Sequence, residues 1–214
     1  MDNIHNIVIT ISRQMASGGR YLGQTVAKRL GFRYVDRDVL GEAAKYFGVE
    51  EKELLLYEEK ALGFWENIMK AFAFGSREYV PPSRPPVYDR DLFEVEAKII
   101  TDIASRCNVV IMGRGGFHIL RNHPGHMSIF FHAPMSFRIK RMMEVYSILD
   151  RDRARSEIEE SDRRREKFIR TMTGVEWTDA RNYHLCINTG MVSFEIAEET
   201  IVRVVEDLKQ NLGL

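Results

Sequence analysis

The stretch ITISRQMASGGRYLG (residues 9–23) decides the fold of this chain. It starts with apolar and β-branched residues typical of a buried strand, passes through a glycine-containing turn, and enters an amphipathic helix. In that helix Leu22, Val26 and Leu30 recur on one face, and Gly31 is well placed to end it. A strand, a glycine turn and a helix in this order predict either an ordinary connection or a loop that holds phosphate.

Five apolar runs have the length of strands and alternate with helical patterns. The runs are NIVITI (6–11), FRYV (32–35), NVVIMG (108–113), MSIFFHA (127–133) and HLCIN (184–188). Helical patterns occupy 91–106, about 155–172, and about 193–212, where Ile196, Thr200, Val204 and Leu208 form one stripe. This alternation predicts an α/β fold, with a parallel five-stranded sheet and helices on both of its faces.

We expect a single domain over residues 1–214 with two additions. Residues 37–106 are too many for one crossover and predict a helical insertion, and 147–182 is predicted to be a lid-like segment. Its charged stretch 150–153 fits the hinge of a lid or an exposed loop. The aromatic part of the insertion, 53–75, is open to three interpretations: local core, a lid over a ligand, or a homodimer contact.

The composition excludes several classes of protein. The 31 basic residues balance 31 acidic ones, so no general field for nucleic acid or an anionic membrane is expected. There is no leader-like N-terminus or long apolar run, and Cys107 and Cys186 read as reduced core residues, which together favour a cytoplasmic protein. The histidines of FHILRNHPGH (117–126) match no metal-binding pattern, so we expect no metal site in the protein itself.

The SGGR turn (17–20) departs from the usual phosphate loop. If Gly18 is the last glycine of that loop, Gly19 stands where lysine belongs and Arg20 where the magnesium-binding hydroxyl belongs. Arg13 and Arg20 flank the turn, and either one could replace the lysine. The expected nucleotide-binding residues are Ala16, Ser17, Gly18, Gly19, Arg20 and Tyr21.

Charged residues also follow the strands. Arg13, Asp36 and Arg114 come at the ends of three predicted strands. Ligands of open α/β sheets bind outside the carboxyl ends of the strands. We therefore expect these side chains to converge on a site for an anionic ligand.

Read in order, ISRQMASGGRYLGQTVAKRLGFRYVDRDVL, VVIMGRGG, IFFHAPMSFRIKRM and EIEESDRRREKF resemble the cytidylate kinase-like family of P-loop proteins over nearly the whole chain. The resemblance implies a three-layer P-loop NTPase-type sandwich with an acceptor-binding insertion and a lid. It further implies transfer of the ATP γ-phosphoryl, with Mg²⁺, to CMP, dCMP or another small phosphorylated acceptor. The alternative is a catalytically inactive nucleotide-binding regulatory module, because the loop lysine and hydroxyl are missing.

The family pattern assigns roles residue by residue. Asp36, Arg114, Asp162 and Arg164 match, whereas Gly115 stands in place of an aspartate. The residues expected to assist transfer are Arg13, Arg20, Arg114, Arg138, Arg141 and Arg165. The residues expected to hold the acceptor are Asp36, Arg37, Arg114, Asp162 and Arg164.

Helical spacing adds a separate expectation for the 155–172 segment. Asp162 and Arg165 fall on the same face as Ile158 and Ile169, so they point toward the body of the protein. They could form an internal ion pair or hold phosphates when a lid closes. Neither interpretation is favoured by the sequence.

Overall fold

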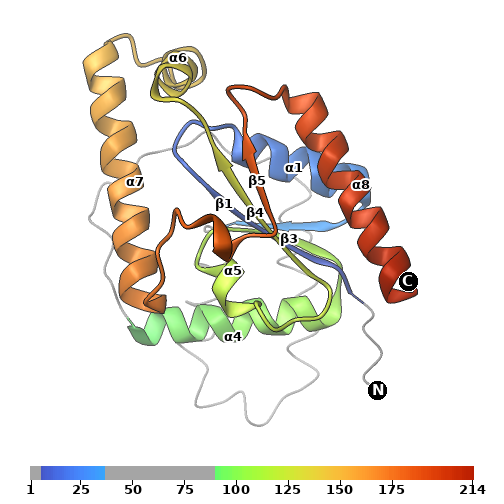
Figure 1. Ribbon diagram of the computed structural model, residues 1–214. Coiled ribbons are helices and arrows are strands. Elements are labelled where there is room, and N and C mark those ends of the chain that lie inside the picture. Colours follow the sequence, from blue (N-terminus) through green and yellow to red (C-terminus); the bar gives the residue numbers. More distant parts are fainter. Residues whose placement is uncertain (1–5, 37–89) are drawn as a thin grey trace.

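The computed structural model describes residues 6–36 and 90–214, and its centre is a parallel sheet of five strands (Figure 1). The strands are β1 (Val8–Arg13), β2 (Arg33–Val35), β3 (Val109–Met112), β4 (His126–His132) and β5 (Leu185–Asn188). Their order across the sheet is β2-β3-β1-β4-β5, and every neighbouring pair is parallel. The carboxyl ends of all five strands therefore face the same edge of the sheet.

Helices cover both faces of this sheet. They are α1 (Gly19–Leu30), α4 (Arg90–Arg106), α5 (Gly116–Ile119), α6 (Met135–Tyr146), α7 (Arg151–Thr173) and α8 (Phe194–Leu212). Helices α1 and α8 pack on one face through a core that includes Ile9, Leu22 and Ile201. Helix α4 packs on the other face, where Ile100 and Ile111 are fully buried. The predicted three-layer α/β sandwich is confirmed.

Helices α6 and α7 form a pair at one side of the sheet (Figure 1). Asp150 caps α7 by accepting bonds from the backbone N–H groups of Asp152 and Arg153. Ile158 and Ile169 are buried along α7, as the spacing predicted. The predicted lid-like segment therefore contains a helix of 23 residues with a buried inner face.

Two sequence-based expectations were wrong. In α8 the buried stripe is Ala197, Ile201 and Val205, whereas Ile196 and Val204 are exposed, so the inward face is one residue further along than predicted. Both faces of α8 carry apolar residues, and the small side chain of Ala197 suits close packing against α1. Cys186 is an exposed residue on the edge strand β5 rather than a core residue, although both cysteines are free thiols.

The expected insertion falls largely on residues 37–89, which lie outside the described residues, as do Arg37 and the aromatic segment 53–75. Its last part, 90–106, is helix α4. Among the described helices, none has the length and hydropathy needed to cross a membrane.

Candidate functional site

The loop between β1 and α1 has the backbone of an anion-binding turn. Ala16 and Gly18 both have positive φ, at 61° and 85°, and Gly18 is the residue before α1, where no side chain caps the helix. The first N–H groups of a helix have no partner within the helix, and the helix dipole adds positive potential there. A side chain at position 18 would also collide with the ring of Phe194. The absence of a side chain at Gly18 therefore lets the ring of Phe194 pack against the loop at the N-terminus of α1.

Neighbouring elements hold the loop in this conformation. The N–H of Gln14 donates to the carbonyl of Phe131 at 2.9 Å, and the Gln14 side chain accepts from the N–H of Ala133 at 3.2 Å. Thr189, just after β5, donates its hydroxyl to the carbonyl of Ser17 at 2.7 Å. Because β4 and β5 anchor the loop directly, its shape is set before any ligand binds.

Arg13 fills the space beside the glycine that stands at the lysine position. A Cβ added at Gly19 would lie 2.7 Å from the Cβ of Arg13, and one added at Gly113 would lie 2.5 Å from Nη1 of Arg13. The Arg13 side chain therefore runs from Gly19 to the end of β3. Burial lowers its pKa to about 10, and the nearby charge of Arg165 acts in the same direction. The guanidinium remains charged at neutral pH and is poorly solvated, so an anion would stabilise it.

Arg20 is engaged differently. Its Nη2 donates to Oδ2 of Asp36 at 2.9 Å, which ties the start of α1 to the end of β2. The hydroxyl of Tyr34 is buried close to this ion pair. Burial raises the pKa of Tyr34 to about 12, so this hydroxyl stays protonated.

Asp162 of α7 connects the loop to two further arginines. Its carboxylate accepts from the N–H of Met15 at 2.7 Å, from Nη1 of Arg138 at 2.5 Å and from Nη1 of Arg165 at 3.1 Å. The ion pair between Asp162 and Arg165 is one of the two alternatives left open by the sequence. Arg138 is almost fully buried, so Asp162 supplies a counter-charge that this guanidinium needs.

Arg114 follows β3 with a φ of 53° and pairs with Glu96 of α4, where its Nε donates to Oε2 at 2.8 Å. Its guanidinium also lies 4.5 Å from the ring centre of Phe168. Sequence reasoning missed Glu96, which is only 2% exposed. The signal was present, because Glu96 lies three residues after Phe93 and four before Ile100, on the apolar face of its helix.

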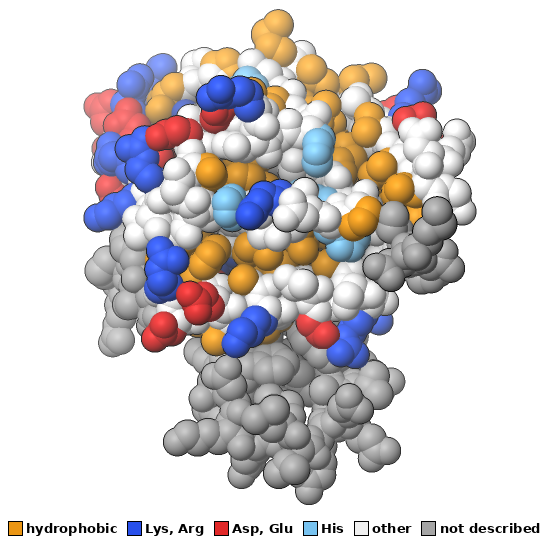
Figure 2. All heavy atoms as spheres, turned by 60° about the horizontal axis from the view of Figure 1, so that its bottom comes forward, with side chains coloured by type: hydrophobic (Ala, Val, Ile, Leu, Met, Phe, Trp, Pro, Cys, Tyr) orange, Lys and Arg blue, Asp and Glu red, His pale blue; other side chains and the backbone are white. Residues whose placement is uncertain are grey.

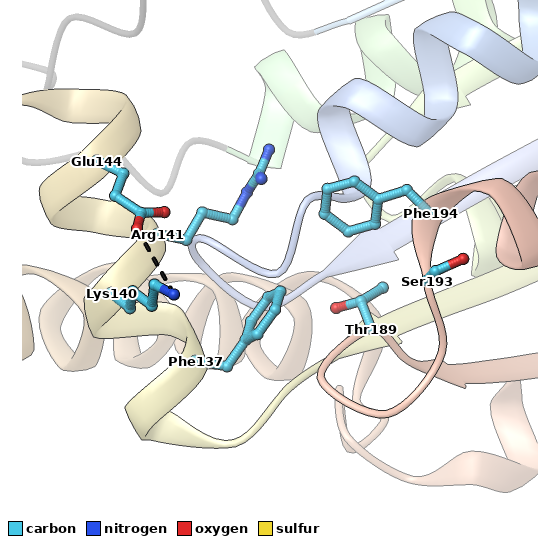
Figure 3. Close-up of a pocket in the computed structure, with 7 residues that line it drawn as sticks. All are labelled: Phe137, Lys140, Arg141, Glu144, Thr189, Ser193 and Phe194. Carbon is cyan, nitrogen blue, oxygen red and sulfur yellow. Dashed lines mark ion pairs between the residues drawn. The ribbon is translucent and has the colours of Figure 1, made fainter.

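A cleft of about 290 Å³ opens beside the loop (Figure 3). Helix α6 contributes Phe137 and Arg141, and Phe194 faces them at the start of α8, with the Arg141 guanidinium 4.7 Å from the ring centre of Phe194. Lys140 and Glu144 lie at its α6 side and pair at 3.8 Å. Since Phe194 also touches Gly18, the cleft is adjacent to the loop.

The structure does not bring all the predicted site residues together. Arg164 lies on α7 and pairs with Glu160 at 3.6 Å, away from the loop. Arg163 and its acidic neighbours form a mixed-charge surface, and Figure 2 shows basic and acidic side chains side by side at the left, where α7 lies. The predicted residues that meet around the loop are Arg13, Arg20, Asp36, Arg138, Asp162 and Arg165.

The loop residues do not fit a protein-bound Mg²⁺. Magnesium takes oxygen ligands, and the usual loop supplies one from a serine or threonine hydroxyl. At that position Arg20 offers only N–H donors, and these are directed at Asp36. In the described ranges, no group of three or more His, Cys, Asp or Glu side chains is arranged to hold a metal ion.

Comparison with known proteins gives the family. A sequence model of the cytidylate kinase-like family matches residues 8–191. The chain is also 27% identical over 184 residues to a cytidylate kinase from Thermococcus kodakarensis (strain ATCC BAA-918 / JCM 12380 / KOD1), covering 86% of this chain and 79% of that protein.

Solved structures agree on the fold. A protein from Eubacterium ventriosum ATCC 27560 matches with a TM-score of 0.70 at 21% identity, covering 94% of this chain and 98% of its own. A gluconokinase from Sinorhizobium meliloti 1021 matches with a TM-score of 0.51 at 18% identity, covering 96% and 97%. Fold and family support a kinase-like function on a nucleotide or another small molecule, and the chain belongs to the cytidylate kinase-like family.

Proposed function

We propose that this protein transfers the γ-phosphoryl group of ATP to a nucleoside monophosphate, with CMP and dCMP as the first candidates. The observation that carries the proposal is the poorly solvated Arg13 guanidinium, which lies beside Gly19 and Gly113 at the mouth of the β1–α1 loop. The relative named a cytidylate kinase supports the choice of acceptor.

The donor occupies the loop and the adjacent cleft. The N–H groups of Gly18 to Tyr21 bind the phosphates, and Arg13 takes the part of the missing lysine. The base lies in the cleft, where Phe137 and Phe194 offer aromatic faces and Arg141 offers a cation.

The acceptor lies outside the ends of β2 and β3. Asp36 and Arg114 mark these ends, and residues 37–106 form the acceptor-side insertion of the proposal. The segment 147–182 serves as the lid, and it already touches the loop through Asp162. Arg138 and Arg165 come from α6 and α7 and lie beside the transferring group.

The reaction needs little covalent chemistry from the protein. An oxygen of the acceptor phosphate attacks the γ-phosphorus, the bond to the β–γ bridging oxygen breaks, and ADP leaves with the electron pair. The fixed arginines stabilise the negative charge on the equatorial oxygens of the transferring group.

A second function is favoured by one contact. Arg114, which the kinase reading assigns to the acceptor, is already paired with the buried carboxylate of Glu96. With that charge neutralised, the protein would bind nucleotide as a regulatory module without transferring phosphate.

The deciding experiment measures ADP release from ATP against a panel of nucleoside monophosphates. The parent is compared with Arg13→Ala, Arg20→Ala and the control Arg203→Ala, a change in an exposed arginine of α8. We expect turnover that depends on the acceptor and falls about a hundredfold in Arg13→Ala, but not in the control. Stabilisation by ATP without turnover on any acceptor would establish the binding module instead.

A further inference from the structure

Arg20 occupies the position at which a phosphate loop normally binds its metal. With Gly18 as the last glycine of the loop pattern, the residue two places further on is Arg20, the second residue of α1. In the usual loop a hydroxyl there ligates the Mg²⁺ that bridges the donor phosphates. Here a permanent cation replaces a metal ligand.

This guanidinium is held at the loop. The Nη2 of Arg20 lies 2.9 Å from Oδ2 of Asp36, and the Asp36 side chain is only 14% exposed. The carboxylate that could otherwise have served a metal therefore already accepts an arginine donor. A divalent cation bound here would displace that contact and meet the charge of Arg20 at close range.

The charge around the loop supports the same conclusion. Among the described residues, the arginines grouped at the loop are Arg13, Arg20, Arg138 and Arg165, and the carboxylates bonded to them are Asp36 and Asp162. Within this described group, the arginines outnumber the carboxylates that are bonded to them. Because these positive charges belong to arginine side chains, they are present at the loop without the binding of a metal ion from solution.

We propose, building on the donor site proposed above, that Arg13 and Arg20 bind the nucleotide triphosphate without a metal ligated by the protein, so that free ATP binds as tightly as its magnesium complex. Guanidinium groups suit this task because they donate two parallel hydrogen bonds to phosphate oxygens and stay charged.

The test is calorimetric titration of the full chain with ATP and with inorganic tripolyphosphate, each in excess magnesium and in EDTA. We expect the two dissociation constants for ATP to agree within about threefold. ATP binding that is tighter by tenfold or more with magnesium overturns this inference and leaves the proposed kinase intact. Absence of ATP binding in both buffers overturns both proposals.

Variants sharpen the comparison. Arg20→Ser restores a hydroxyl at the metal position, and we expect its ATP affinity in EDTA to fall at least about tenfold, with recovery in magnesium. Arg20→Lys keeps the charge and should remain independent of magnesium, which also guards against misfolding of the serine variant. Arg203→Ser, the same kind of change on the exposed side of α8, should behave as the parent. If Arg20→Ser binds ATP in EDTA as tightly as the parent, Arg20 does not replace the metal.

Discussion

Under the proposed function, Arg13 and Gly19 exchange the chemical roles that their positions carry in the usual phosphate loop. The first glycine of the usual loop pattern stands five residues before the last one and so falls on Arg13, while its lysine falls on Gly19. The structure explains why only one of the two positions has room for a side chain. The two positions are so close that a side chain at 19 would collide with the stem of Arg13.

This reciprocity predicts a rescue by double substitution. Gly19→Lys alone should cost about 1–3 kcal/mol of stability, because its Cβ would lie 2.7 Å from Arg13 and 3.0 Å from Phe131. Arg13→Gly alone should weaken ATP binding at least about tenfold. The double variant Arg13→Gly/Gly19→Lys rebuilds the usual loop and should recover ATP affinity, as measured by calorimetry. A double variant no better than Arg13→Gly would refute the exchange.

The sequence identified this loop but could not choose between its two arginines. Arg13 precedes the glycines and Arg20 follows them in the sequence, and only the fold shows that Arg20 is paired with Asp36 while Arg13 lies against Gly113. Arg114 was predicted at the right strand end, but its partner was not, because Glu96 is 18 residues away along the chain. Pairings between elements depend on packing that local patterns do not specify.

The pair of Glu96 and Arg114 gives a second prediction at this scale. Glu96→Gln keeps the volume but leaves the Arg114 guanidinium, only 15% exposed, without this carboxylate, so unfolding should become easier by about 3 kcal/mol. Glu94→Gln on the exposed side of the same helix is the matched control and should change stability by less than about 0.5 kcal/mol. Urea titration of both variants measures the difference. Equal effects would mean that the buried pair contributes nothing specific.

At the scale of elements, the strands were easier to predict than the faces of the helices. A continuous apolar run such as 108–113 is typical of a strand in a sheet whose two faces are both covered by helices. Helix α8 carries apolar residues on two adjacent faces, and its packing against α1 selects the face of Ala197 rather than that of Ile196. The choice depends on a partner helix that periodicity does not reveal.

The contact between β1 and β4 predicts a dependence of stability on pH. His126 Nε2 lies 2.7 Å from the hydroxyl of Thr10, and burial lowers the pKa of His126 to about 3. In the unfolded chain this histidine titrates near 6.5, so below that pH the unfolded state binds more protons. Stability should therefore be lost as pH falls from about 6.5 toward 3, by about 1.4 kcal/mol per pH unit for this group.

Denaturant titrations at a series of pH values test this dependence. The variant His126→Gln cannot take up the proton, so its stability should fall less steeply than that of the parent over the same window. His118 and His123 also have pKa values lowered by burial and remain in both proteins, so the comparison isolates the effect of His126. If the free energy of unfolding fell with pH equally steeply in the parent and the variant, His126 would be excluded as the cause of the pH dependence.

At the scale of the whole molecule, the proposed donor site is assembled from distant parts of the chain. The loop comes from residues 13–21, and the cleft is lined by α6 and by the start of α8, more than a hundred residues later. Thr189 links the two parts through the carbonyl of Ser17, and Phe194 links them by packing on Gly18. The order of the strands makes this possible, because β1 and β5 both flank β4.

This assembly predicts that base binding and phosphate binding can be separated. Phe194→Leu retains an apolar side chain beside Gly18 but removes the aromatic face from the cleft. Stacking of a base on an aromatic ring is worth about 1–3 kcal/mol, so ATP should bind roughly tenfold more weakly or worse. Inorganic tripolyphosphate uses only the loop, and its affinity should be unchanged. Equal losses for both ligands would show that Phe194 acts through the shape of the loop, and an unchanged ATP affinity would place the base outside this cleft.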